Sequence, residues 1–288
     1  MPPLQIQRED LQAILAAHTG NQSLQSAFER AREPEQLLSV LGRYIQFNSA
    51  FGAGLANLAG EIAARQRLFQ DPDEPLHIAA DRASEVASDF FYAAVDEFDD
   101  RATPWRDTHR TLAQATLKGL GTYFGFTVER LNDVVRINDA TRKGMDRVWE
   151  GYGIGARLEE ERLFSAMGFH TGSEILADQE FVIIDRHLRE KRPDVVTALD
   201  KMKVPILGQQ HNAYYWIRIH TGVEAEHFDA ALKGVNNAQR FYAGARAPDA
   251  VKGDILAGFS SFAQVQSDFM NALAEGLTAS SASGLSPR

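Results

Sequence analysis

Three residues on one predicted helix have the types and the spacing of metal ligands. His220, Glu224 and His227 stand at positions i, i+4 and i+7, so they share one face of an α-helix. The same face continues through Ile217 and Ala231, and apolar residues at helical spacing are expected to point into the core. Burying two imidazoles and a carboxylate is costly unless they are paired or bind a metal. The alternative is a solvated helix face that carries two ordinary histidines.

Further carboxylates and a histidine occur in other predicted helices. Glu97 and His109 lie on either side of a proline-containing turn, Glu61 interrupts a run of small apolar residues, and Glu174 follows a glycine-led segment. Four helices can therefore each send Glu, or Glu and His, toward one core, which is how helical bundles hold two iron or manganese ions. Carboxylate and imidazole ligands without sulfur suit iron or manganese, with open positions for oxygen.

Composition limits what the rest of the chain can do. The sequence has 288 residues, no cysteine, 8 histidines, 39 acidic residues and a formal charge of −9. The absence of cysteine excludes disulfides, thiolate metal sites and a cysteine nucleophile. The acidic balance argues against nucleic acid as the main partner, because phosphate binding needs a basic surface. The N-terminus lacks the pattern of an export signal and no apolar run is long enough to span a membrane, which predicts a cytoplasmic protein without a membrane partner.

The elements that must position these residues are predicted to be helices. Prolines delimit long segments rich in Ala, Leu, Glu, Arg and Gln, and alternating β-branched runs of strand length are missing. We expect an all-α protein with one domain over residues 1–277 and a disordered Ser/Ala/Gly-rich tail over residues 278–288. The predicted helices span residues 8–18, 23–32, 35–69, 76–100, 105–124, 127–149, 156–190, 194–203, 208–242 and 248–275.

Over roughly residues 46–241 the sequence resembles the heme-oxygenase-like diiron oxidases and oxygenases, a branch of the heme oxygenase/TenA-like superfamily. The resemblance implies a heme-oxygenase-like helical bundle. Three motifs carry it. They are an Asp-Glu…His block of Asp96, Glu97 and His109, a Gly-x5-Glu segment from Gly168 to Glu174, and a His-x3-Glu-x2-His segment of His220, Glu224 and His227.

The resemblance also implies how two irons would be held by three histidines and three or four carboxylates, one of which bridges. The residues that match the family motifs fall into one set of Glu97, His109 and His220 and a second set of Glu174, Glu224 and His227. Glu61, about one long helix ahead of Glu97, resembles the extra carboxylate that some members use.

Two departures from the family pattern affect this assignment. The family usually has Asp at the middle of the last motif, where this chain has Glu224, so the carboxylate reaches about one methylene further. The gap from Glu174 to His220 is also long for the family, which leaves Glu180 as an alternative ligand. We favour Glu174, because the glycine-led run before it matches the family better.

For function, the resemblance implies an oxygen-activating non-heme diiron oxidase or oxygenase. Its cofactors would be two iron ions cycling between Fe²⁺ and Fe³⁺, or a manganese–iron pair, with O₂ as cosubstrate and an external reductant. The substrate would be a small molecule resembling an amino acid, an amine or a fatty acid, which undergoes N-oxygenation, desaturation or C–C cleavage, as in natural-product biosynthesis. A homodimer is suggested by fold analogy alone.

Other branches of the superfamily fit less well. The TenA-type hydrolases use a cysteine nucleophile, which this chain lacks, and true heme oxygenases place a histidine on the first core helix, where residues 37–69 contain none. Two alternatives stay open from the sequence. In the first alternative, the chain is a non-catalytic helical binding protein, whose buried acids would pair with arginine. In the second, it is a metal-independent or mono-metal member of the same superfamily.

Overall fold

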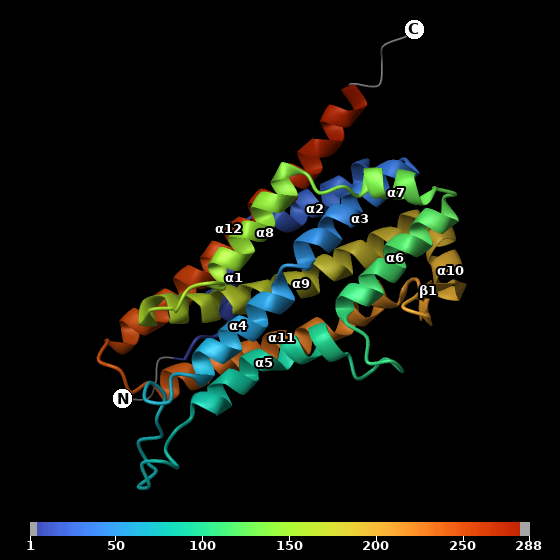
Figure 1. Cartoon of the computed structure of the whole chain (residues 1–288). Coiled ribbons are helices and arrows are strands. Elements are labelled where there is room, and N and C mark those ends of the chain that lie inside the picture. The colour runs from blue at the N-terminus through green and yellow to red at the C-terminus, as the bar shows by residue number, and fades with distance from the viewer. Residues whose placement is uncertain (1–4, 283–288) are drawn as a thin grey trace.

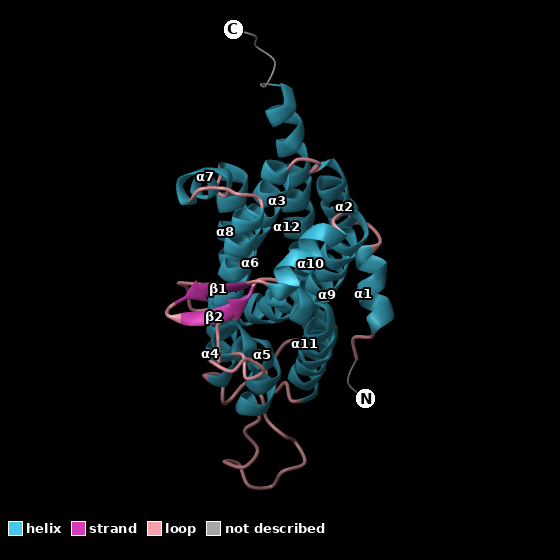
Figure 2. Ribbon diagram, turned by 90° about the vertical axis from the view of Figure 1, so that its right-hand side faces the viewer, coloured by secondary structure: helices cyan, strands magenta, loops and turns pink. Residues whose placement is uncertain are grey.

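The computed structural model describes residues 5–282 and is helical apart from one short hairpin and the connecting loops (Figures 1 and 2). This confirms the predicted all-α class. The helices are α1 (Arg8–Leu15), α2 (Gly20–Arg30), α3 (Pro34–Asn48), α4 (Phe51–Ala63), α5 (Ala83–Asp99), α6 (His109–Tyr123), α7 (Val128–Val134), α8 (Asp139–Gly151), α9 (Glu160–Lys191), α10 (Pro193–Lys201), α11 (Tyr215–Arg240) and α12 (Pro248–Ala282). The strands are β1 (Lys203–Ile206) and β2 (Gln209–Asn212).

Helix α9 is the central element, and it packs against α12, α11 and α2 (Figure 1). Glycines let α9 and α12 approach until their backbones touch. A Cβ on Gly168 would lie 1.8 Å from the carbonyl oxygen of Ile255, and a Cβ on Gly258 would lie 1.8 Å from that of Ser165. Because real atoms do not come so close, only glycine fits at these two positions.

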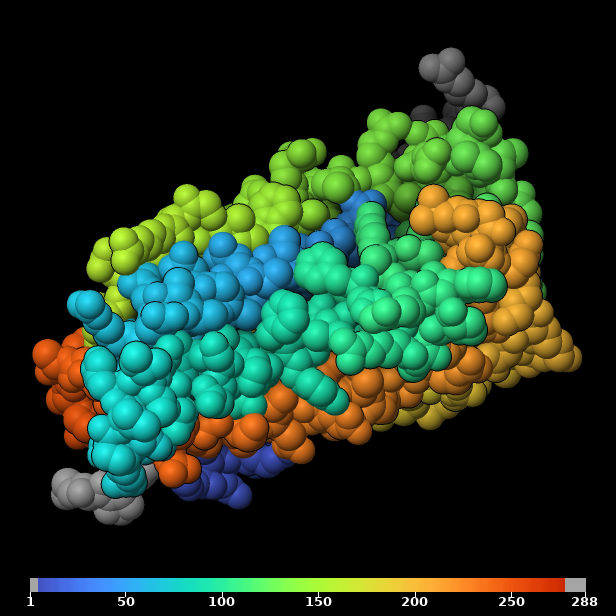
Figure 3. Space-filling view, turned by 60° about the horizontal axis from the view of Figure 1, so that its bottom comes forward, coloured from blue at the N-terminus to red at the C-terminus, as the bar shows by residue number. Residues whose placement is uncertain are grey.

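The helices that carry the candidate ligands pack together in the other half of the bundle. Helix α5 lies between α4 and α11, while α11 also contacts α9 and α6. Figure 3 shows α4, α5 and the start of α6 side by side on one face, with α11 along its lower edge. Four of these elements, α5, α6, α9 and α11, each bring ligand-type side chains to the same interior region.

Two predicted long helices are divided in the structure. The segment predicted as one helix over residues 35–69 forms α3 and α4 with a break at Ser49, whose hydroxyl donates a hydrogen bond to the carbonyl of Gln46. Such a side-chain bond competes with the helical hydrogen-bond pattern. The segment 127–149 is likewise divided, because Asn138 accepts a hydrogen bond from the Thr141 amide and starts α8 as its N-cap.

The β-hairpin was not expected from the sequence, which predicted a loop at Val204 and Pro205 and a helix from residue 208. Strands β1 and β2 pair antiparallel through a two-residue turn, in which Leu207 and Gly208 have φ values of 50° and 78°. Two positive φ values match the turn that joins tightly twisted strands. Val204 and Ile206 are buried while their neighbours are exposed, so the two-residue alternation was present but too short to stand out.

The C-terminal boundary also differs from the expectation. Helix α12 continues through Ala282, so the first residues of the tail predicted to be disordered over 278–288 are helical. No glycine or proline interrupts residues 278–282, and each residue added to an existing helix gains a backbone hydrogen bond. The rest of the predicted tail lies outside the described residues.

The core is one large cluster of buried Leu, Ile, Val, Phe and Ala side chains, to which nearly all the helices contribute. Within residues 5–282, no helix combines the length and the apolar character needed to cross a membrane.

Candidate metal centre

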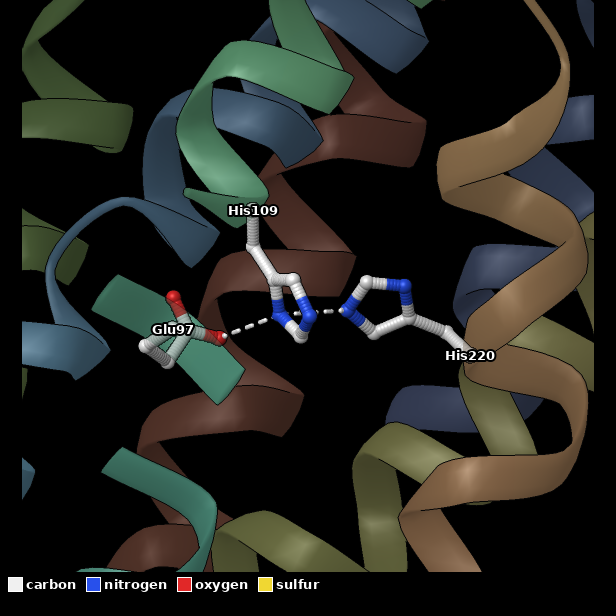
Figure 4. A group of neighbouring side chains, drawn as sticks. All are labelled: Glu97, His109 and His220. Atoms are coloured by element: carbon white, nitrogen blue, oxygen red, sulfur yellow. Dashed lines mark hydrogen bonds and ion pairs between the residues drawn. The ribbon is translucent and has the colours of Figure 1, made fainter. Parts of the chain in front are cut away.

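The first group of candidate ligands joins three helices (Figure 4). Glu97 comes from the last turns of α5, His109 is the first residue of α6, and His220 projects from α11. The Nδ1 atom of His109 lies 3.1 Å from Glu97 Oε1 and 3.2 Å from His220 Nε2. One ligand-type atom from each residue lies within 4.8 Å of the others, which is close enough for one metal ion to bind all three.

The second group joins α9 and α11. Glu174 comes from α9, and Glu224 and His227 lie one turn apart on α11. His227 Nδ1 is 3.3 Å from Glu224 Oε2 and 3.5 Å from Glu174 Oε2. All three side chains are buried, and their ligand-type atoms also fall within 4.8 Å of one another.

The two groups adjoin each other inside the bundle. His220 Nε2 is 3.6 Å from Glu224 Oε1, which links the first group to the second along one face of α11. A small cavity of about 30 Å³ is lined by Glu97, Glu174, Glu224 and His227. The membership of the two groups matches the two ligand sets that the family resemblance implies. The structure thus brings six of the seven residues together, while their role as ligands stays a prediction.

Hydrogen bonds fix which ring nitrogen of two histidines faces the centre. His220 Nδ1 is 2.6 Å from the carbonyl oxygen of Trp216, so it carries the proton and leaves the Nε2 lone pair facing the first group. His227 Nε2 is 3.1 Å from Asp96 Oδ2, so it donates there and leaves Nδ1 facing Glu174 and Glu224. A partner on the outer nitrogen is the usual way in which a metal-binding histidine is oriented.

Two acids beside the histidines of the centre were not among the predicted ligands, although Asp96 belongs to the Asp-Glu…His motif. Asp96 hydrogen-bonds to His227, and Asp100 Oδ2 lies 3.8 Å from His109 Nε2. Both acids flank Glu97 at the end of α5, so a single acidic segment supplies one candidate ligand and two supporting carboxylates. The acidic run was visible in the sequence, but a run of charges more often marks a solvated face.

Burial and neighbouring charges shift the pKa values of the side chains in the cluster in different directions. Burial, and next the neighbouring His109, lower the pKa of His220 to about 3, so this imidazole is neutral and able to bind metal at neutral pH. Burial raises the pKa of Glu224, and the nearby Glu174 raises it further. Burial opposes the charge of His227, but its bonds to Asp96 and the two glutamates outweigh this and raise its pKa.

The carboxylates of the cluster have no lysine or arginine to balance them. Among residues 5–282, the ion pairs of Glu97, Glu174 and Glu224 are all with histidines. Neighbouring buried carboxylates repel one another unless a proton or a metal neutralises them. Three carboxylates and three imidazoles without sulfur are the donors that iron and manganese accept, so these residues fit a two-metal centre of that kind.

Glu61, the seventh candidate ligand, lies in neither group. It forms an ion pair with Arg65 at 3.0 Å, one turn along α4, and accepts a hydrogen bond from the Leu158 amide. This is the arginine-paired arrangement expected for a structural acid.

Glu180, the alternative to Glu174, forms hydrogen bonds with residues outside both groups. It accepts hydrogen bonds from the Tyr44 hydroxyl at 2.7 Å and from Gln266 Nε2 at 2.9 Å. Burial raises the pKa of Glu180 to about 7. Six residues earlier on α9, Glu174 belongs to the second group instead, and its Oε1 lies 3.2 Å from Nδ1 of the buried His170.

A larger cavity of about 400 Å³ adjoins the first group. Its inner wall includes Glu97, His109 and His220, and its sides are formed by apolar residues such as Ile45, Phe98 and Trp216. The break between α3 and α4 contributes Ser49 to the same cavity. A volume of this size is in the range of small-molecule sites.

Comparisons with known proteins identify the fold. No family model matches the chain, and no curated protein does. A solved structure of a CADD-like protein of unknown function from Nostoc punctiforme superimposes with a TM-score of 0.62 and 14% identity, over 93% of this chain and 95% of that one. A TenA homolog from Pseudomonas syringae pv. tomato superimposes with a TM-score of 0.56 and 10% identity, over 93% and 90%.

The chain therefore has the heme-oxygenase-like helical fold that the resemblance implied. At identities of 14% and 10% the likeness establishes the fold, and the chemistry has to be argued from the side chains of this chain.

Proposed function

We propose that this protein is an oxygen-activating non-heme diiron oxidase or oxygenase that acts on a small organic substrate. The observation that carries the proposal is the pair of adjoining Glu/His groups among four helices. Five of the six side chains are buried, and none has a lysine or arginine partner within the described part of the chain. Salt-bridged structural acids would have arginine or lysine partners, as Glu61 does.

Some residues would bind the metal ions, and others would orient these metal ligands. The first group, Glu97, His109 and His220, would bind one ion. The second group, Glu174, Glu224 and His227, would bind the other. Two irons bound there would supply oxygen activation at the inner wall of the larger cavity. Trp216 and Asp96 fix the histidine tautomers.

The proposal extends to the substrate class and the type of reaction. The substrate is an amino acid, an amine or a fatty acid, and the outcome is N-oxygenation, desaturation or C–C cleavage. An external reductant would supply the electrons. A manganese–iron pair would suit the same ligands.

Metal analysis after anaerobic iron titration tests the proposal, followed by oxygen exposure with a reductant and measurement of oxygen consumption. We expect about two irons per chain for the wild type, in line with two-metal carboxylate sites in helical bundles. Glu97→Ala and His220→Ala should each lower the iron content and abolish oxygen uptake. His187→Ala serves as the matched control, because His187 lies on α9 against Phe28, outside both groups.

The possible results separate the competing functions. An iron content near one that both variants abolish would point to a mono-metal enzyme of this fold. No iron binding, together with unchanged behaviour of both variants, would refute the diiron proposal and leave a metal-independent enzyme or a binding protein.

A further inference from the structure

One charged side chain in the larger cavity is not accounted for by the metal centre. Arg110 follows His109 at the start of α6, and both side chains line the same cavity. Arg110 is exposed, and its one protein partner within residues 5–282 is the carbonyl oxygen of Ile45, at 3.5 Å from Nη1. No carboxylate among those residues forms an ion pair with it, so most of its five N–H donors are available.

The surroundings of Arg110 favour an anion. Thr108, the N-cap of α6, also lines the cavity, so the cavity meets the positive end of that helix. A guanidinium is well suited to a carboxylate, because its planar donors match the two oxygens.

The remaining walls limit what can be attached to this anion. Ile45, Ala53, Phe98, Ala113 and Trp216 provide apolar surface in the cavity that Arg110 and the first ligand group also line. Among the described residues that line the cavity, Glu97 is the one acid, and it is engaged with His109 in the candidate metal site. The cavity therefore offers a partner to a carboxylate but no free acid to an ammonium group.

We infer that Arg110 binds the carboxylate of the substrate, and that the substrate is a monocarboxylic acid with an apolar body and no required amino group. This inference rests on the proposed function, because it identifies which of the proposed substrate classes the cavity accepts. Arg110 would hold the carboxylate in the cavity that Glu97, His109 and His220 also line, and the apolar body would lie against the apolar lining residues. A simple amine would meet an unbalanced guanidinium and be repelled.

Binding of octanoate, n-octylamine and 1-octanol to metal-free protein tests the inference without requiring turnover. Isothermal titration calorimetry gives the affinities. We expect octanoate to bind at least about tenfold more tightly than either analogue, and Arg110→Gln to weaken octanoate binding by about tenfold or more, in line with the strength of a charge-assisted hydrogen bond. Arg110→Lys should retain part of the affinity, because it keeps the charge and loses the planar fork.

Arg142→Gln is the matched control, because Arg142 is an exposed helical arginine on α8 away from the cavity, and it should bind octanoate like the wild type. Iron titration of Arg110→Gln should give the wild-type stoichiometry. If octanoate fails to bind, binds no better than octylamine, or is unaffected by Arg110→Gln, the inference is overturned. Failure of iron binding with intact Arg110-dependent octanoate binding would instead overturn the proposed function alone.

Discussion

At the scale of single residues, two histidines of the candidate centre have a hydrogen-bond acceptor on their outer side, and the third has an acid nearby. His220 donates to a backbone carbonyl, His227 donates to Asp96, and His109 has Asp100 nearby. Motif spacing on α11 could place His220 and His227 on one face, because the helical period is fixed. It could not show which nitrogen faces inward, because that depends on acids and carbonyls from other parts of the chain.

Glu180 gives a prediction that separates it from the candidate ligands. Because burial raises its folded-state pKa to about 7 from the ordinary 4.5, the folded state binds more protons than the unfolded state between these values. Stability should therefore fall as the pH rises from about 4.5 through 7, by roughly 3 kcal/mol when complete. In metal-free protein, Glu180→Gln should remove this loss, so that the variant is more stable than the wild type at pH 8 and similar at pH 4.5.

Urea unfolding of both proteins across this pH range measures the effect. Glu190→Gln, an exposed position on the same helix, is the control and should follow the wild type. Equal pH dependence of Glu180→Gln and the wild type would show that Glu180 is not a buried carboxyl held by Tyr44 and Gln266.

At the scale of elements, the glycine of the second sequence motif has a packing role. Gly168 lies against the backbone of α12 at Ile255, and so it fixes how closely α9 approaches α12. This placement sets the position of Glu174, which lies less than two turns further along α9. The motif therefore combines a ligand-type residue with the contact that positions its helix, a link that the spacing Gly-x5-Glu did not reveal.

Gly168→Ala should destabilise the protein. The added methyl group would meet a backbone carbonyl, which a side-chain rotation cannot relieve, and we expect a loss of about 2–3 kcal/mol. Gly253→Ala is the matched change on α12, where a Cβ meets nothing within 4 Å, and helix propensity should make it neutral or more stable by up to about 1 kcal/mol. The free energy of unfolding in urea measures both, and equal values for the two variants would contradict the packing assignment.

At the scale of the whole molecule, the candidate centre joins helices that are distant in sequence. Glu97, His109, Glu174 and His220 come from four different helices, and α9 and α11 hold the two groups together. A metal bound there would link one half of the bundle to the central helix. Because the ligand set is assembled by folding, metal would bind the folded state in preference to the unfolded state.

Metal removal should therefore lower the thermal stability. At iron concentrations about 100-fold above Kd, one bound ion adds about 2.7 kcal/mol, which for a chain of this size raises Tm by roughly 4–5 °C. Anaerobic thermal melts with Fe²⁺ and with EDTA measure the shift. His220→Ala should lose it and His187→Ala should keep it, whereas a wild-type Tm that is indifferent to iron would argue against a buried metal centre.

The sequence by itself determined the helical class and the candidate ligand types, because helical periodicity and residue chemistry are local properties. His220, Glu224 and His227 needed only the pitch of one helix to be grouped. The tertiary structure decided what local patterns do not contain. Glu174 and not Glu180 faces His227, and Glu61 forms an ion pair with Arg65. Arg110 has no acidic partner within residues 5–282. These outcomes depend on which helices pack against one another, and that packing is set by contacts such as Gly168 on Ile255 between segments far apart in the chain.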